Sequence, residues 1–500
     1  MAKTFTPLAS TTAFLQREHK LFINNQWRAG EKGETFATFN PATEEEIAQV
    51  ATATVADVNA AVAAAREAFD NPQSEWQKLR PRDRQNLMLK LADLMERDAQ
   101  ILAELECLDN GKSAAIAQAV DIRVGIDVVR YMAGWATKIS GKSVDVSLPY
   151  MPAETQFHGF TRREPVGVVA AIVTWNFPFL LACWKLAPAL ATGCTIVMKP
   201  ADETPITALK VAELMQEAGF PAGVFNLITG GAAGTGAALS SHPGVNKITF
   251  TGSTKVGAII GKAAMDNMAR LTLELGGKSP TIVLPDANVE EAIAGAAEAI
   301  FFNHGQVCSA GSRLYVHESI YDKVVAGIAA AANQMTLGNA MDPNINMGPL
   351  ISAKQQRMVQ GYIDQGVELG GEVLSGGSSF GPGYFVKPTV IADVEQNFPL
   401  VQEEIFGPVL VAIPFKDNEE AIQLANDNIY GLGASIWSND LSVVHKMIPR
   451  IRSGSVWVNC HSALDPELPF GGYKMSGFGR EMGEEALLSY TEHKSVLIKL

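Results

Sequence analysis

Cysteine is scarce in this sequence, which has five in 500 residues: Cys107, Cys183, Cys194, Cys308 and Cys460. Their number is odd, they are widely scattered, and no two have the C-x-x-C spacing of zinc and redox motifs. This pattern argues against a disulfide framework and against a zinc centre, so no metal site is predicted. It favours a reducing compartment, and we expect a cytoplasmic protein.

Long apolar runs are also missing. A membrane-spanning helix needs about 20 consecutive apolar residues. The most apolar stretch, residues 165–198, is interrupted by Asn176, Pro178, Lys185, Pro188 and Gly193. The N-terminal MAKTFTPLASTTAF lacks the apolar core of a secretory signal. No membrane partner is therefore expected.

Positive charge is in the minority, because 40 Lys and Arg residues face 53 Asp and Glu residues and the net charge is -13. Proteins that bind nucleic acid need clustered Lys and Arg to neutralise phosphates, so no nucleic-acid partner is expected. The composition is 47% hydrophobic and 19% charged, which is typical of a soluble globular protein with a sizeable core. The length favours two to four domains.

The chain alternates between predicted strands and helices, with no repeat or low-complexity segment. Helical periodicity is seen at 57–71, 82–106, 178–192, 205–219, 289–303 and 319–335. Buried strands are expected at 166–173, 195–199, 224–228, 247–252, 281–284 and 312–317. Such alternation predicts two α/β domains with parallel sheets and a boundary near residue 270.

Two segments fit neither domain. Residues 143–165 and the C-terminal SYTEHKSVLIKL both have an extended pattern, and both could form an edge sheet. An exposed edge strand tends to pair with another chain, so oligomerisation is the modest inference.

Cys308 lies in the small, polar setting GQVCSAGSR. A buried structural cysteine normally has apolar neighbours, whereas a reactive one needs access and a group that favours the thiolate. The local sequence alone leaves both readings open.

Two motifs suggest dinucleotide binding. In FTGSTKVG a strand runs into Gly252 and Ser253 and then a helix, whose free N–H groups could bind a pyrophosphate. In MKPADETP, Lys199 ends a strand and Asp202 follows, where an acidic group can accept from ribose hydroxyls. Taken alone, the first motif also fits a turn that binds nothing, and the second also fits charged side chains exposed to solvent.

Two further residues could carry chemistry. Glu274 lies in the apolar run LTLELGG, where burial would raise its pKa toward that of a general base near neutrality. Asn176, in TWNFP, has a side-chain amide that could stabilise an oxyanion. Taken singly, Glu274 could be satisfied by backbone donors and Asn176 could be a turn residue.

Together these stretches resemble the aldehyde dehydrogenase superfamily over nearly the whole chain. The matching motifs are WNFP, MKPADETP, FTGST, LELGGKSP, GQVCSAGSR, EEIFGPV and PFGGYKMSGFGRE, in the family's order and spacing. The resemblance implies an α/β fold of two doubly wound parallel-sheet domains plus a small β extension for oligomerisation. It implies a NAD-binding domain at 20–142 and 159–272, a catalytic domain at 273–482, and oligomerisation segments at 143–158 and 483–500.

The resemblance also implies catalytic roles. Cys308 would be the nucleophile that forms a thiohemiacetal and then a thioester. Asn176 and the backbone N–H of Cys308 would stabilise the oxyanion, and Glu274 would activate the hydrolytic water and could also activate the thiol. Lys185 matches a recurrent position near the site.

For the cofactor, the resemblance implies NAD bound by Trp175, Lys199, Asp202, Gly252, Ser253, Leu275, Glu404 and Phe406. The family's acidic ribose ligand is usually glutamate, and here Asp202 is one methylene shorter. Its charge still disfavours a 2′-phosphate but leaves more room for one, so NADP is the second choice. Thr174 stands at the position before WNFP where the family commonly has proline, and we assign no function to this difference.

A closer resemblance, to bacterial phenylacetaldehyde dehydrogenases, rests on MAGWATKISGKSVDVSLP and WVNCHSALDPELPFGG. Family mapping lines the substrate tunnel with Phe177, Leu180, Leu181, Trp184, Val307, Leu464 and Phe470. This apolar and aromatic set favours an arylalkyl or medium aliphatic aldehyde.

Other readings stay open. Trp184, together with the carboxylate of Asp465 or Glu467, could instead bind the quaternary ammonium group of betaine aldehyde. A CoA-acylating relative and a catalytically idle one are less favoured, because Glu274, Cys308 and Asn176 are all present. The resemblance and the edge segments favour a homotetramer built from dimers.

Overall fold

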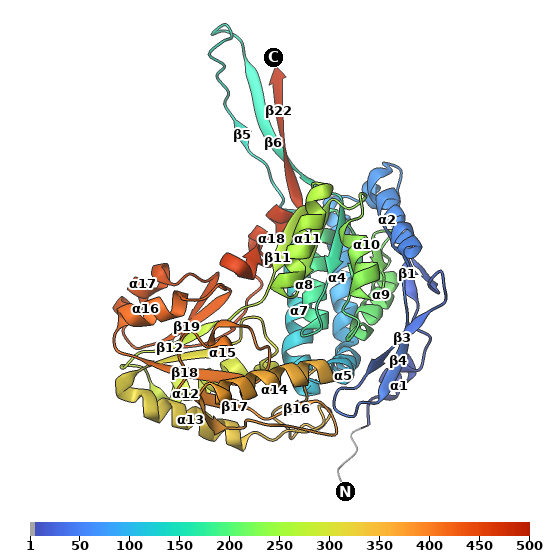
Figure 1. The fold of residues 1–500 in the computed structure, drawn as a ribbon. Helices are drawn as coiled ribbons and strands as arrows, with labels where there is room; N and C mark the ends of the chain where they lie inside the picture. The colour runs from blue at the N-terminus through green and yellow to red at the C-terminus, as the bar shows by residue number, and fades with distance from the viewer. Residues whose placement is uncertain (1–5) are drawn as a thin grey trace.

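The computed structural model describes residues 6–500, which form two open α/β sheets and a projecting three-stranded sheet (Figure 1). Within these residues no helix is both long and apolar enough to cross a membrane. The described chain therefore has the fold class expected from the sequence, two parallel-sheet units plus a small β extension.

The first sheet has the order β2-β1-β9-β8-β7-β10-β11-β21, and its five central strands are parallel. These strands are β9 (Phe225–Leu227), β8 (Thr195–Lys199), β7 (Val168–Ile172), β10 (Lys247–Thr251) and β11 (Arg270–Glu274). Antiparallel edges are added by β1 (Leu21–Ile23), β2 (Gln26–Arg28) and β21 (Gly477–Phe478). Parallel strands ending at one edge create the usual ligand-binding crevice of such sheets.

Helices cover both faces of this sheet, because alternate strand residues point to opposite sides. In β7, Val169 and Ala171 join one buried cluster and Val168 and Ala170 join another. The first cluster packs against α4 (Pro81–Arg97), α5 (Ala99–Asn110), α7 (Arg123–Trp135), α8 (Pro178–Thr192) and α9 (Ile206–Ala218). The second packs against α2 (Val55–Asp70) and α11 (Thr254–Asp266).

The second sheet has the order β14-β17-β18-β13-β12-β19-β20 and is parallel except at β14. Its strands are β14 (Glu372–Ser375), β17 (Thr389–Ala392), β18 (Val409–Phe415), β13 (Arg313–His317), β12 (Pro280–Val283), β19 (Gly433–Trp437) and β20 (Ser455–Val458). One face packs against α12 (Val289–Phe301) and α13 (Tyr321–Gln334). The other packs against α14 (Ala353–Glu368), α16 (Asn418–Asn426) and α17 (Leu441–Met447).

The projecting sheet is built from the two segments that the sequence left outside the domains. β6 (Phe157–Pro165) pairs antiparallel with β22 (Thr491–Lys499) along its whole length, and β5 (Ser143–Val144) pairs with β6. This arm leaves the body and carries the C-terminus (Figure 1). The prediction that both segments contribute to an edge sheet is confirmed, whereas residues 145–156 between β5 and β6 form no strand.

Two predicted helices end differently in the structure. The periodic stretch 82–106 is two helices, because Asp98 leaves the helical conformation (φ -98°, ψ 15°) between α4 and α5. The helix expected at 289–303 stops at Phe301, because Asn303 (φ 46°) and His304 (φ 58°) adopt left-handed backbone. That turn directs the chain into the loop that carries Cys308. The domain limits given above stay a prediction.

Candidate active site

A cavity of about 200 Å³ contains Cys308 in its wall. The sequence-derived substrate residues all line it: Phe177, Leu180, Leu181, Trp184, Val307, Leu464 and Phe470. Asn176 and Glu274 line it too, so segments far apart in the sequence converge on one space. Sequence reasoning missed the other lining residues, which are Val120, Thr251, Glu298, Ala299, Phe302, Ser309, His461 and Ser462.

Some of the missed residues had a local signal. Ser309 is the immediate neighbour of Cys308, and Ala299 and Phe302 are three positions apart, the spacing of one face of the helix expected at 289–303. Glu298 is exposed, and it is the one carboxylate besides Glu274 in the lining. Val120 had no such signal, since it enters from the distant π-helical segment η1 (Ala117–Ile122).

The side chain of Cys308 is more accessible than those of the three buried cysteines. Its side chain is partly exposed, whereas Cys107, Cys183 and Cys194 are fully enclosed in the body. Burial raises the pKa of the Cys308 thiol, and the nearby carboxylates of Glu404 and Glu274 raise it further. The thiol is therefore protonated before a base or a positive charge acts on it.

Asn176 is buried and its side-chain amide is held in place. Its Nδ2 donates to the carbonyl oxygen of Gln306 at 3.0 Å, which leaves the second N–H of the amide for another acceptor. The Asn176 backbone carbonyl accepts from Lys112 Nζ at 2.9 Å and from Asn303 Nδ2 at 3.1 Å. These contacts fix the segment from both sides.

Lys112 belongs to a buried charged group behind Asn176. Its ammonium donates to Asp121 and lies 3.7 Å from Glu106, and all three side chains are 1% exposed or less. It also lies 4.2 Å from the ring centre of Phe177. Burial raises the pKa of Glu106 to about 8. A triad of this kind costs desolvation energy and in return imposes a defined position on its neighbours.

Glu274 ends β11 with neither carboxylate oxygen hydrogen-bonded to any residue in the range 6–500. Burial raises its pKa well above the usual value and the charge of Glu481 adds to this, while Lys185 opposes it. A carboxyl group left free of donors and raised in pKa has the properties of a general base.

Lys185 does not line the cavity. It is fully buried in α8, forms an ion pair with Glu481 and donates to Thr249 Oγ1 at 3.3 Å. Glu481 had no role in the sequence-derived site, although it ends the motif PFGGYKMSGFGRE. Lys185 and Glu481 both lie close enough to Glu274 to affect its pKa, so the three charged groups act on one another.

Five of the sequence-derived cofactor residues lie at or just after the carboxyl ends of strands in the first sheet: Lys199, Asp202, Gly252, Ser253 and Leu275. Lys199 ends β8, and its Nζ donates to Asp202 Oδ1 at 2.9 Å. Gly252 follows β10, and Ser253 caps α11 by accepting from the N–H of Val256. Leu275 is buried and packs against Gly257 of α11. The carboxylate of Asp202 and the free N–H groups of α11 suit a ribose and a pyrophosphate, so this edge fits a dinucleotide.

The remaining cofactor residues lie near the Cys308 loop. Glu404 accepts from the backbone N–H of Gly277 at 2.9 Å, and burial raises its pKa to about 7. A side chain at Gly277 would collide with the carbonyl of Cys308, so glycine is required for this close approach. Trp175 and Phe406 meet edge to face, with ring centres 5.2 Å apart.

The family model described as "Aldehyde dehydrogenase family" matches residues 27–496. Phenylacetaldehyde dehydrogenase of Pseudomonas fluorescens is 46% identical, with 100% of each chain covered. The NAD+ complex of an aldehyde dehydrogenase from Bacillus cereus superposes with a TM-score of 0.97 at 45% identity, covering 100% of each chain. A betaine aldehyde dehydrogenase from Staphylococcus aureus, in complex with NAD+, has a TM-score of 0.94 at 37% identity, covering 99% of this chain and 97% of that one.

Proposed function

The chain belongs to the aldehyde dehydrogenase family and is an NAD-dependent enzyme of it, and we propose that its substrate is a hydrophobic arylalkyl aldehyde of the phenylacetaldehyde type. The product would be the corresponding carboxylic acid, formed through a thioester on Cys308.

The apolar wall of the cavity carries the substrate proposal. Phe177 and Phe302 stack with ring centres 6.2 Å apart, and the ring centres of Trp184 and Phe470 are 5.4 Å apart. An aromatic substrate would bury its ring among these faces, while its carbonyl reached the polar end at Asn176. The full-length similarity to a phenylacetaldehyde dehydrogenase supports the same substrate class.

Betaine aldehyde is the second candidate, and Glu298 is the observation that favours it. A cationic substrate would gain from a carboxylate beside aromatic rings. Asp465 and Glu467, which the sequence suggested for that charge, do not line the cavity. Most of the wall is apolar or aromatic, which supports a neutral aromatic substrate more than a cationic one.

In the proposed mechanism, the Cys308 sulfur adds to the aldehyde carbon while its proton leaves for a base. The oxyanion would accept from the free N–H of Asn176 Nδ2 and from the backbone N–H of Cys308. NAD, when bound, supplies the acceptor for the substrate's hydride. The carbon is oxidised by two electrons, and the acyl group stays on sulfur as a thioester.

Hydrolysis would use Glu274. Its carboxylate would take a proton from a water molecule that attacks the thioester, and the carboxylic acid would leave as the Cys308 thiolate is restored. The absence of hydrogen-bond donors to Glu274 from residues 6–500 leaves its oxygens available for that water. Lys185, paired with Glu481, would stabilise the charged form of Glu274 from behind.

Cofactor choice, assembly and location extend the proposal. Asp202 would accept from the adenosine ribose, with NADP as a slower alternative because the shorter acid leaves room for a phosphate.

The arm of β5, β6 and β22 would join subunits into a homotetramer, and the exposed Val144, Leu497 and Ile498 on it support an interface. Five unbridged cysteines support a cytoplasmic location.

A substrate panel tests the proposal. NADH formation would be measured with phenylacetaldehyde, hexanal and betaine aldehyde, each with and without CoA. We expect kcat/KM for phenylacetaldehyde to be at least tenfold higher, about 1.4 kcal/mol of transition-state discrimination. The Glu298→Gln variant should lower the rate with betaine aldehyde and leave phenylacetaldehyde unchanged. A preference for betaine aldehyde would overturn the arylalkyl class, and a rate that requires CoA would overturn hydrolysis.

A further inference from the structure

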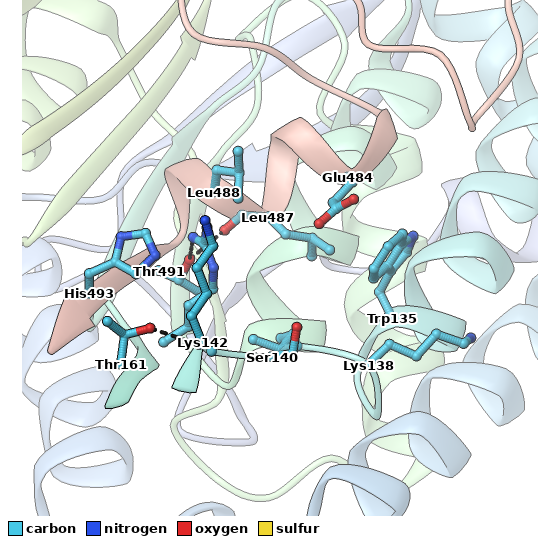
Figure 2. Close-up of a pocket in the computed structure, with 13 residues that line it drawn as sticks. Trp135, Lys138, Ser140, Lys142, Thr161, Glu484, Leu487, Leu488, Thr491 and His493 are labelled. Atoms are coloured by element: carbon cyan, nitrogen blue, oxygen red, sulfur yellow. Dashed lines mark hydrogen bonds between the residues drawn. The ribbon is translucent and has the colours of Figure 1, made fainter. Parts of the chain in front are cut away.

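A second polar hollow lies where the arm leaves the body. It has a volume of about 170 Å³, and its walls come from the end of α7, residues 138–142, β6, α18 (Gly483–Ser489) and β22. Figure 2 shows Thr491 and His493 on one side of it and Trp135 and Lys138 on the other. A neighbouring hollow of about 270 Å³ shares Ile139, Arg163 and Thr491 with it. Neither hollow contains a residue that lines the substrate cavity.

The two hollows are rich in positive charge although the protein has a net charge of -13. Their basic side chains are Arg84, Lys138, Lys142, Arg162, Arg163 and His493. The one acidic lining residue is Glu484. No ion pair within residues 6–500 involves any of these basic groups.

Some arginines elsewhere on the surface form ion pairs. Arg17 pairs with Glu213, and Arg450 pairs with Glu419. Exposed arginines without an ion pair within residues 6–500 also occur elsewhere, at Arg82, Arg123, Arg357 and Arg452. What distinguishes the hollows is therefore the number of unpaired basic groups gathered in one place.

Two of these arginines, Arg84 and Arg163, are half-buried and form no ion pair within residues 6–500. Arg163 donates to the hydroxyl of Thr491 at 3.3 Å, and within the described part of the chain it has no carboxylate partner. The Nε of Arg84 is buried and makes no hydrogen bond to any residue from 6 to 500, and burial lowers the pKa of this guanidinium. Charges taken out of water are normally compensated by an opposite charge. The charge of the neighbouring Asp83 acts on Arg84 without forming an ion pair with it, and no carboxylate within residues 6–500 pairs with Arg163.

We propose that this pair of hollows is a binding site for a small multivalent oxyanion, such as phosphate or pyrophosphate. Guanidinium groups bind phosphate oxygens through two parallel hydrogen bonds, and lysine adds a point charge. Arg163, shared by both hollows, would be the central ligand, with Arg84 on one side and Lys142 on the other. The Ser140 hydroxyl and the Trp135 indole lie in the same wall as further donors.

The test is a calorimetric titration of the assembled protein with inorganic pyrophosphate and, separately, inorganic phosphate in metal-free buffer. The protein is saturated with NAD throughout, so that the probe cannot bind at the cofactor's own pyrophosphate position. We expect one pyrophosphate per chain, and weaker binding of phosphate because it carries less charge. Phosphate that binds as tightly as pyrophosphate would support a single-phosphate site and the same class of ligand.

Two variants and a control locate the site. Arg163→Gln and Lys142→Gln should each weaken pyrophosphate binding about tenfold or more, which is the loss of one charge-assisted contact. Arg450→Gln removes one exposed charge that lines neither hollow, and this variant should bind like the wild type. Lys142 is exposed, so K142Q remains informative if R163Q alters assembly, which size-exclusion chromatography would reveal. NADH formation should be unchanged in K142Q.

Absence of binding to the wild-type protein would overturn the proposal, since the hollow would then be closed or filled by a neighbouring chain. Equal affinity in K142Q, R163Q and R450Q would overturn it as well, because binding would then be located elsewhere.

Discussion

The Nζ atom of Lys112 lies 2.9 Å from the backbone carbonyl oxygen of Asn176. The same lysine is buried between Asp121 and Glu106, so its position is determined by α5 and the segment that follows it. The amide that would stabilise the oxyanion is thus positioned by a charged residue that does not line the substrate cavity.

Replacing Lys112 by methionine should lower kcat by about tenfold or more, because small displacements of a catalytic group have large effects on rate. The KM for NAD should change little. Stability should also fall, by about 3 kcal/mol, since two buried carboxyl groups lose their partner. Stopped-flow NADH formation and thermal unfolding measure both effects.

Lys210→Met is the matched control for that variant. Lys210 is also largely buried and pairs with Asp98 and Glu213, away from the cavity. It should lose stability without the loss of kcat. Equal losses of kcat in K112M and K210M would show that Lys112 acts only on folding.

Asn176→Ala removes the proposed oxyanion donor. We expect kcat/KM to fall about 10²- to 10³-fold, the range found for one such donor in other enzymes. NAD binding, followed by quenching of tryptophan fluorescence, should be unchanged. A loss below threefold would mean that the backbone N–H of Cys308 stabilises the oxyanion without help from the side chain.

Cys308→Ala should abolish aldehyde oxidation and leave the Kd for NAD within about twofold. The thiol acts on the substrate carbonyl, and the cofactor residues lie on other elements, at Lys199 and Ser253. Cys460→Ala, which changes an exposed cysteine, is the control and should keep full activity. A large loss of NAD affinity in C308A would contradict the division of roles.

Glu274→Gln should slow thioester hydrolysis more than hydride transfer, giving a rapid burst of NADH followed by a slow phase. Because burial raises the pKa of Glu274 well above its usual value, the fraction of charged base grows as pH rises. The wild-type hydrolysis rate should therefore increase with pH and level off above that pKa, and E274Q should lose this dependence. A burst-free time course in E274Q would assign the base elsewhere.

Affinity for NAD should fall in mild acid. Burial raises the pKa of Glu404 to about 7, so below that pH the carboxyl is protonated and accepts fewer hydrogen bonds from a ribose. The KM for NAD should rise between pH 8 and pH 6, about tenfold per unit at most. Glu404→Gln should have a raised and nearly pH-independent KM, whereas Glu403→Gln, at the neighbouring exposed carboxylate, should behave like the wild type.

Local patterns in the sequence predicted much of the framework. The helix expected at 178–192 is α8 to the residue, because proline at its start and Gly193 at its end mark both boundaries. The strand expected at 195–199 is β8. Such elements are specified by residues within a few positions of one another, and so they are readable without the tertiary structure.

Other features depend on contacts between distant segments. Glu481 pairs with Lys185 across 296 positions of sequence, and Lys112 reaches Asn176 across 64. No periodicity or turn signal reports such pairs, so neither Glu481 nor Lys112 was assigned a role from the sequence. The left-handed turn at Asn303 and His304 was also missed, although Asn and His adopt this backbone more often than most residues, because the helical periodicity of 289–303 continues up to this turn.

Direct detection of the acyl-enzyme tests the proposed role of Cys308. Glu274→Gln would be mixed with NAD and phenylacetaldehyde, quenched in acid and digested, and its peptides measured by mass spectrometry. We expect a phenylacetyl group on the peptide that contains Cys308, and none after the same treatment without NAD. An unmodified Cys308 peptide during rapid NADH formation, or an acyl group on another cysteine, would contradict the proposed role.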